Sequence, residues 1–226
     1  MKTAIQRLEA QSVTLYLNDD LQHFDWQAAL PLLSSQRREQ CLKFKHEQGR
    51  RTCAAAYLLL CEGLRREYGI TEPPVFEYGE HGKPAIVGRP DIHFNMSHCR
   101  EAALCALSDK PVGVDVESIG RYKESLARYT MNDDELAQIQ QSDRPDVAFI
   151  RLWTQKEAVL KLAGTGITDN MRSALTAAAP PLTASAPPLT AAAPPLASTV
   201  LDGSAVETLA TFINEDKQYI YSIATP

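Results

Sequence analysis

The sequence predicts an α+β fold, in which long helices pack with mostly antiparallel strands. Two segments, at about 47–68 and 147–163, carry apolar residues at helical spacing. Around them lie short runs rich in valine, isoleucine, phenylalanine and tyrosine, separated by turn residues. Because short turns join these runs, neighbouring strands are expected to pair in antiparallel fashion.

The first half of the chain is expected to run from helix to sheet. An early strand at 12–17 precedes a charged helical segment that follows Ser35. The long helix at 47–68 comes next, and Gly69 stands where a C-terminal cap is expected. Short strands with turns between them are then predicted at 75–78, 92–97, 101–108 and 112–118.

The second half is expected to contain two helices and a hairpin. A helix near 133–141 precedes the strongest one, at 147–163, which Gly164 ends. Residues 205–225 have the pattern of a β-hairpin with its turn at 214–216.

A repeat with a step of seven residues interrupts this half at about 175–197. Leucine and a pair of prolines both recur at that step. Paired prolines rule out a continuous helix, because proline lacks a backbone donor and clashes with the preceding turn. We therefore expect an Ala/Pro-rich loop that is extended or disordered.

Composition excludes few functions, but it bears on the protein's partners and on its location in the cell. The formal net charge is −5, so an anion site needs a local cluster of lysine and arginine, and nucleic acid is not an expected partner. Five cysteines without a CxxC pair favour reduced thiols and a cytoplasmic protein. No signal peptide and no membrane-spanning segment is recognised.

The segment VGVDVES, at 112–118, alternates valine with Gly113, Asp115 and Glu117. Alternate side chains of a strand share a face, so the valines are expected to face the core and both carboxylates the other side. Two like charges at this spacing repel unless a cation lies between them. Mg²⁺ suits such a place, since it binds one or two carboxylates together with substrate phosphates. The alternative is a solvated polar face, which is common in sheets.

The helix at 147–163 carries charged residues close to its apolar face. Lys156 falls near the middle of the apolar arc, and Glu157 lies at its edge, in line with Lys161. One interpretation is a cleft in which lysine meets phosphate and the glutamate meets a metal or a proton. The other is a Lys156 stem that reaches solvent, beside an ordinary Glu157–Lys161 helix pair.

Three further places could bind an anion or have an ordinary structural role. His98 ends the run FNMSH, Lys83 lies in the turn GEHGKP, and Arg50 and Arg51 open the first long helix. The spacing of the histidine and cysteines does not fit a zinc site.

Four motifs follow one another along the chain: GKP at 82–84, FNxSH at 94–98, GxDxE at 113–117 and WTxKEAxxKxxGxG at 153–166. This ordered series resembles the 4′-phosphopantetheinyl transferases of the surfactin-synthetase-activating type, over about 33–167. The resemblance implies Mg²⁺-dependent transfer of the phosphopantetheine arm of coenzyme A to a serine of an acyl or peptidyl carrier protein. Adenosine 3′,5′-bisphosphate would be released.

The resemblance also implies roles for single residues. Asp115, Glu117 and Glu157 would hold Mg²⁺, or Glu157 would be the base that deprotonates the carrier serine. Catalysis would involve Glu157, Lys161 and His98. Coenzyme A would be bound by a set of basic and polar side chains: Arg51, Lys83, Ser97, His98, Asp115, Lys156 and Lys161.

The implied architecture is two similar lobes related by a pseudo-twofold, each a small sheet packed with a long helix. The lobes would be residues 1–111 and 112–226 of a monomer, with coenzyme A in the cleft between them. The family often carries a further carboxylate after the metal strand, for which Asp133, Asp134 and Glu135 are the candidates.

Two other functions stay open at this point. One is a module that binds coenzyme A or a carrier protein without catalysis, and the other is a Mg²⁺-dependent nucleotide hydrolase. The complete set of two strand carboxylates, a helix carboxylate and two lysines argues against a module that has lost its chemistry.

Overall fold

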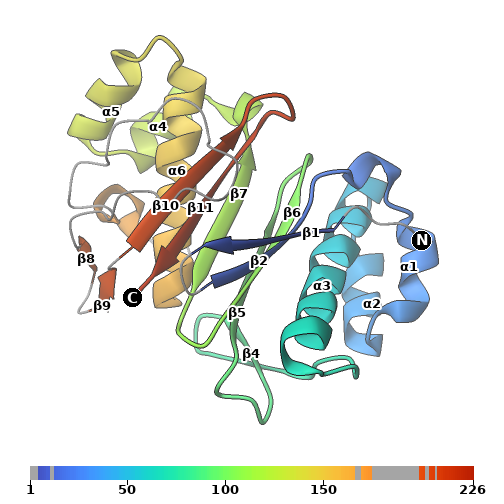
Figure 1. Ribbon diagram of the computed structural model, residues 1–226. Helices are drawn as coiled ribbons and strands as arrows, with labels where there is room; N and C mark the ends of the chain where they lie inside the picture. The colour runs from blue at the N-terminus through green and yellow to red at the C-terminus, as the bar shows by residue number, and fades with distance from the viewer. Residues whose placement is uncertain (1–4, 11–12, 166–168, 175–198, 202–203, 207) are drawn as a thin grey trace.

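The computed structural model describes residues 5–10, 13–165, 169–174, 199–201, 204–206 and 208–226. The Ala/Pro-rich loop predicted at 175–197 lies outside the described residues. Within them, helices and antiparallel sheets confirm the predicted α+β class (Figure 1).

Two antiparallel sheets form the centre of the molecule. The first has the strand order β1-β2-β6-β5 and the second the order β10-β11-β7. Their strands are β1 (Gln6–Ala10), β2 (Val13–Asn18), β5 (His93–His98), β6 (Ala103–Ser108), β7 (Gly113–Ser118), β10 (Thr208–Asn214) and β11 (Tyr219–Thr225). Two small hairpins add β3 (Phe76–Tyr78), β4 (Pro84–Ile86), β8 (Thr199–Leu201) and β9 (Ser204–Val206).

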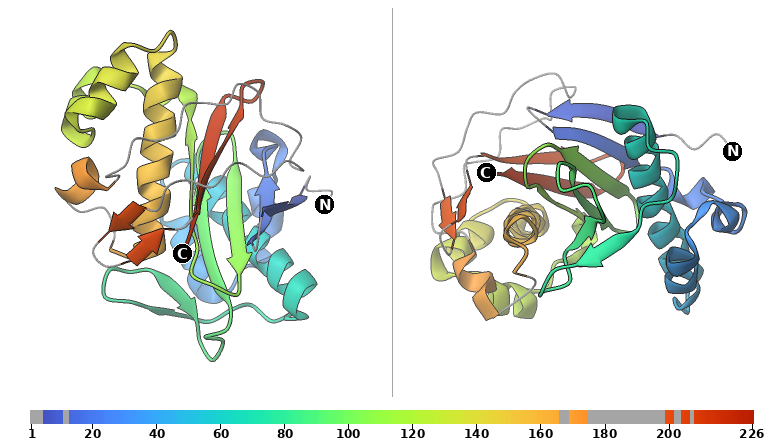
Figure 2. Two further views of the ribbon diagram at one scale, coloured as in Figure 1. Left: turned by 60° about the vertical axis from the view of Figure 1, so that its left-hand side comes forward. Right: turned by 90° about the horizontal axis from the view of Figure 1, so that it is seen from below.

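Helices cover the two sheets from opposite sides. The first sheet packs on α3, and the second on α6 (Figure 2, right). The α-helices are α1 (Trp26–Ala29), α2 (Ser35–Leu42), α3 (Glu47–Tyr68), α4 (Glu124–Thr130), α5 (Asp133–Gln140) and α6 (Pro145–Ala163). Short 3₁₀ turns are η1 (Leu21–His23), η2 (Leu30–Leu32), η3 (Ile119–Arg121) and η4 (Asp169–Ser173).

The long helices begin and end close to the predicted residues. Helix α3 has the predicted bounds, and Gly69 after it has a φ of 67°, which is the left-handed conformation of a C-terminal cap. Helix α6 begins at Pro145, two residues before the predicted start, because proline suits the first turn of a helix. Strands β1 and β4 were not predicted.

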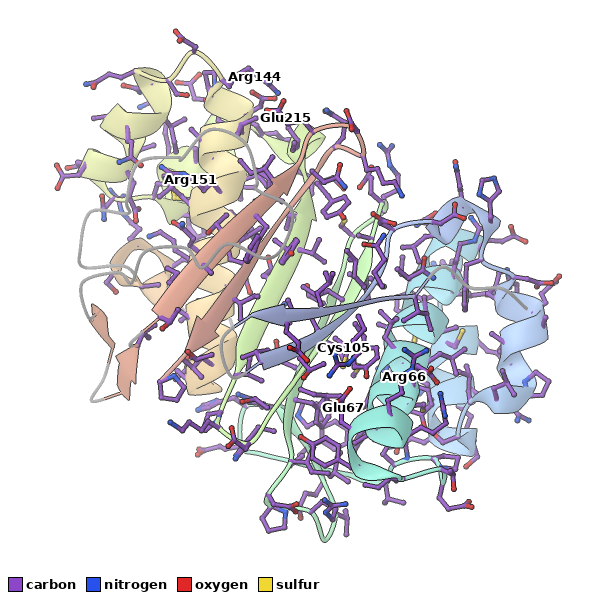
Figure 3. The ribbon with its side chains drawn as sticks, viewed as in Figure 1. Arg66, Glu67, Cys105, Arg144, Arg151 and Glu215 are labelled. Carbon is purple, nitrogen blue, oxygen red and sulfur yellow. The ribbon has the colours of Figure 1, made fainter. Side chains whose placement is uncertain are left out.

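Glu67 ties the end of α3 to the first sheet, and Figure 3 labels it. Its carboxylate accepts hydrogen bonds from Arg7 Nε (2.8 Å) on β1 and from Tyr16 Oη (2.5 Å) on β2. Charged contacts of this kind explain why β1, whose side chains are mostly exposed, lacks the apolar alternation that predicts a strand.

The two sheets share one hydrophobic core at β7. Val114 and Val116 on β7 pack with Leu15 and Leu104 of the first sheet and with Ile223 of the second. The predicted inward face of the valines is therefore confirmed. The relation of the two halves by a pseudo-twofold, and a boundary at residue 111, stay predictions.

Side chains, and not a β-ladder, join the neighbouring edges of the two sheets. Asn95 Oδ1 on β5 accepts the backbone N–H of Val114 (2.9 Å), and Ser97 Oγ accepts that of Val116 (3.2 Å). These bonds satisfy buried amide groups of β7 and place the end of β5 beside Asp115.

Candidate active site

The face of β7 that carries the carboxylates is covered by helix α6. A Cβ atom on Gly113 would lie 2.0 Å from the carbonyl oxygen of Ala158, so only glycine lets the helix approach this strand. Asp115, next on the same face, is 3% exposed. The alternative of a solvated polar face is therefore wrong, because the helix excludes water from it.

Asp115 lies at the centre of a polar cluster from three elements. Its Oδ1 atom accepts hydrogen bonds from Lys161 Nζ on α6 (2.6 Å) and from Ser97 Oγ on β5 (2.8 Å). Lys161 Nζ also lies 3.1 Å from Ser97 Oγ. The second oxygen, Asp115 Oδ2, is buried and has no hydrogen-bond partner among the described residues. This oxygen is therefore available to a ligand as far as the described residues go.

Glu157 faces the same cluster from α6. It is 5% exposed, and its Oε1 atom is buried without a hydrogen-bond partner in the described part of the chain. Burial, together with the negative charge of Asp115, raises the pKa of the Glu157 carboxyl to about 7. The alternative of an ordinary Glu157–Lys161 helix pair is not what the structure has, since Lys161 forms its ion pair with Asp115.

Glu117 completes the group of carboxylates. Its Oε1 atom binds Arg121 Nη1 on η3 at 2.5 Å. Burial and the charge of Asp115 raise the pKa of the Glu117 carboxyl above its usual value. The charge of Asp115 therefore adds to burial in raising the pKa of both glutamates.

These residues fit a hard divalent cation that has further ligands of its own. No three His, Cys, Asp or Glu side chains of the described residues are placed to hold a metal ion by themselves. The two unpartnered oxygens, Asp115 Oδ2 and Glu157 Oε1, and the mutual repulsion of the carboxylates are what a cation would relieve. Mg²⁺ commonly takes one or two protein carboxylates and completes its shell with water and phosphate oxygens.

His98 ends β5, and the positive charge of Arg37 acts on it from α2. Partial burial and the charge of Lys161 lower the pKa of His98, and Arg37 adds to this effect. The Arg37 guanidinium lies 5.1 Å from the ring centre of Tyr57 and 5.9 Å from that of Phe76. Sequence reasoning missed Arg37, because nothing in the run QRRE shows which arginine meets aromatic rings.

Comparison with known proteins shows which family the chain belongs to. A family model described as the 4′-phosphopantetheinyl transferase superfamily matches residues 111–209. The 4′-phosphopantetheinyl transferase HetI of Nostoc is 31% identical over 159 residues, which cover 66% of this chain and 67% of the relative. The chain belongs to the 4′-phosphopantetheinyl transferase superfamily.

Further relatives in the superfamily come from Bacillus subtilis. A 4′-phosphopantetheinyl transferase of that organism is 28% identical over 158 residues, and the 4′-phosphopantetheinyl transferase Sfp of strain 168 is 26% identical over 157. In both comparisons the match covers 68% of this chain and 70% of the relative. These findings confirm the resemblance that the four motifs indicated.

The matched region of this superfamily member contains the three carboxylates and Lys161 but not every predicted site residue. His98, Lys83 and Arg51 precede residue 111, where the family match begins. No described helix has the length and apolar character needed to cross a bilayer.

Lys83 and Arg51 have surroundings different from those of Lys161. Lys83 Nζ donates to the carbonyl oxygens of Leu162 (3.0 Å) and Val112 (3.4 Å), at the end of α6. Burial lowers the pKa of Lys83 to about 8. Arg51 Nε is buried and has no partner among the described residues, whereas Arg50 donates to Phe44 O at 2.9 Å.

The structure does not bring Lys156 to the carboxylates. Its side chain is fully buried, and Nζ donates to Met171 O on η4 (2.6 Å) and pairs with Glu135 Oε2 on α5 (2.8 Å). The alternative of a stem that reaches solvent is therefore wrong. Of the three acidic candidates after β7, Glu135 is the buried one, and with Asn132 it forms the capping box of α5.

Proposed function

We propose that the protein transfers the 4′-phosphopantetheine arm of coenzyme A to a serine hydroxyl of an acyl or peptidyl carrier protein, in a Mg²⁺-dependent reaction. Adenosine 3′,5′-bisphosphate is the leaving group. The observation that carries the proposal is the pair of buried, unpartnered carboxylate oxygens of Asp115 and Glu157, beside Lys161, in a member of this superfamily.

In this proposal Asp115, Glu117 and Glu157 hold the metal. Bound there together with the pyrophosphate of coenzyme A, Mg²⁺ would neutralise charge on the phosphate oxygens. The carboxylates orient that complex and keep it out of bulk water. Support comes from the burial of Asp115 and Glu157 and from the raised pKa values of Glu117 and Glu157, which are caused by burial first and by the charge of Asp115 second.

In the alternative, Glu157 is the base, and Asp115 and Glu117 hold the metal without it. The serine oxygen attacks phosphorus, the pyrophosphate bond breaks, and the hydroxyl proton must leave. A carboxyl with a pKa of about 7 is suited to accept a proton near neutral pH. Its unpartnered Oε1 atom is free to do so, and replacement by glutamine distinguishes this use from a purely metal-binding one.

Lys161, His98 and Ser97 are proposed to contact the phosphates. Lys161 is bound to Asp115 and Ser97, so its charge is fixed in place before the substrate arrives. Charge that grows on the bridging oxygen as the bond breaks is stabilised by such a preorganised cation. Asp115 contributes to coenzyme A binding through the metal and through Lys161.

The 3′-phosphate end is proposed to lie toward α2 and α3. Arg51 has an unpartnered Nε atom, and Arg37 has no carboxylate partner among the described residues. Lys83 uses two N–H groups on backbone carbonyls, which leaves its third for a phosphate. Lys156 is left out, since its donors are already bound inside the protein.

We further propose that the enzyme acts as a monomer. One chain supplies β5, β7 and α6, and hence every carboxylate and the lysine of the proposed centre. No second copy is needed to complete it.

The test is transfer to a panel of carrier proteins. The protein is incubated with coenzyme A and Mg²⁺ and with apo acyl and peptidyl carriers, and carrier mass is measured. A gain equal to one phosphopantetheine arm on a serine is expected for at least one carrier. Coenzyme A binding without any mass gain, or phosphate release from nucleotides without a carrier, would contradict the proposal.

A further inference from the structure

We propose that Thr154, Ser222 and Thr211 are positioning residues that fix where helix α6 lies on the second sheet. They would thereby hold Glu157 and Lys161 beside Asp115. The inference rests on the proposed function and extends it to residues that touch neither the substrate nor a metal.

Ser222 and Thr211 form a row with Asp115 on one face of the second sheet. Ser222 on β11 stands directly opposite Asp115 on β7, and Thr211 on β10 stands opposite Ser222. Directly opposed residues of antiparallel strands share a face, so the row runs across all three strands beneath α6. Helix α6 follows this face of the sheet in Figure 2 (left).

Helix α6 is bound to this row through hydroxyl groups. Thr154 Oγ1 lies 2.8 Å from Ser222 Oγ, which in turn lies 2.9 Å from Thr211 Oγ1. Gln155 Nε2 donates to Thr211 Oγ1 at 2.9 Å. Thr154 and Ser222 are both fully buried.

The direction of each hydrogen bond follows from the number of hydrogens. Thr154 donates its only hydroxyl hydrogen to Arg151 O (3.0 Å), so it must accept from Ser222. Ser222 must then accept from Thr211, which accepts from Gln155. Each of the three hydroxyl hydrogens is thus donated within this series of hydrogen bonds, which does not reach a carboxylate. Its role is therefore to hold the helix and not to move protons.

Directional bonds matter here because they join α6 to β10 and β11, on which it also packs through apolar side chains such as Ala158, Leu209 and Ala224. The polar contacts of Lys161 with Asp115 and of Lys156 with Glu135 are made to other elements. A slide by one residue, about 1.5 Å, would break both the Thr154 and the Gln155 bonds. Thr154 lies one turn before Glu157 and two turns before Lys161, so all three move together.

The test compares Thr154→Val and Ser222→Ala with Thr130→Val as control. Thr130 is buried, and within the described part of the chain its hydroxyl bonds only to Leu126 O of its own helix α4 (2.8 Å). We expect Thr154→Val to lower kcat about tenfold, because small displacements of catalytic groups are costly. The KM for coenzyme A should change less than twofold, and Thr154→Ser should restore kcat.

A second readout does not depend on turnover. Calorimetry with Mg²⁺ and coenzyme A should show Mg²⁺ affinity weakened several-fold in Thr154→Val and unchanged in Thr130→Val. The double variant Thr154→Val/Ser222→Ala should be little worse than Ser222→Ala alone, since Ser222→Ala already removes the bond to Thr154.

Three results would overturn the inference. One is a Thr154→Val protein with wild-type kcat and Mg²⁺ affinity, whatever its melting temperature. Another is full additivity of the two substitutions, and the third is a wild-type protein that binds no Mg²⁺. If the wild type transfers the arm to no carrier, the proposed function fails, and Mg²⁺ affinity alone decides the positioning role.

Discussion

Glu157 shows most clearly what it costs to place carboxylates together. Burial and Asp115 raise its pKa to about 7 from an ordinary value of 4.5. The folded protein therefore holds this proton more tightly than the unfolded chain does. It follows that the metal-free fold loses stability as the pH rises from about 4.5 to about 7, and a bound cation would reverse the loss.

Replacing Glu157 by glutamine should remove this dependence. At pH 8 and without metal, Glu157→Gln should raise the free energy of unfolding by about 3 kcal/mol, since the pKa is raised from 4.5 to about 7 and one pKa unit corresponds to about 1.4 kcal/mol. Urea denaturation in a chelator, at pH 5 and pH 8, measures the difference. As a control, Asp134→Asn replaces an exposed carboxylate and should keep the wild-type dependence of the unfolding free energy on pH. If Glu157→Gln kept the wild-type dependence of the unfolding free energy on pH, the raised pKa of Glu157 would be contradicted.

At the scale of elements, Lys156 fastens three segments to one another. From α6 it binds Glu135 on α5 and a carbonyl of η4, and Trp153 and Leu160 pack on the same side with Met171. Breaking a buried ion pair by removal of one partner typically costs about 3–5 kcal/mol, because the other charge stays buried.

We therefore expect Lys156→Met to lower the free energy of unfolding by about that amount. The double variant Lys156→Met/Glu135→Gln should regain much of it, since no charge is then left alone. Urea denaturation gives both values, and calorimetry should show coenzyme A affinity close to that of the wild type. A Lys156→Met protein of normal stability that no longer binds coenzyme A would instead support a phosphate contact.

Local signals in the sequence were enough for the long helices and for one face of the site. Periodicity with Gly69 and Gly164 predicts where α3 and α6 end, and the alternation in β7 places Asp115 and Glu117 on one face. What covers that face depends on packing between distant segments. The same holds for the Lys156–Glu135 pair, whose partners lie on different helices and give no pattern of their own.

At the scale of the whole molecule, the two halves are bound into one unit. They share the core around Val114 and Val116, and the ends of the sheets are linked by Asp19. Its carboxylate pairs with Lys217 Nζ (2.8 Å) and accepts from Tyr219 Oη (3.1 Å). A shared core predicts that neither half unfolds alone.

The two tryptophans can test this prediction, since Trp26 belongs to α1 and Trp153 to α6. In Trp153→Phe and Trp26→Phe variants, the remaining tryptophan reports on one half. Each variant's fluorescence transition in urea should coincide with its own far-ultraviolet circular dichroism transition. Separate midpoints for the two probes within one variant would show that the halves unfold independently.

Asp115, Glu117 and Glu157 are proposed to form a Mg²⁺ site for phosphopantetheine transfer. The decisive measurement is the rate of arm transfer to a carrier protein as a function of Mg²⁺ concentration. The wild type should show saturable dependence on Mg²⁺, and Asp134→Ala should match it. Asp115→Ala should stay folded by circular dichroism and show no transfer at any Mg²⁺ concentration. Transfer by the wild type in excess chelator, or a normal Mg²⁺ response in Asp115→Ala, would contradict the claim.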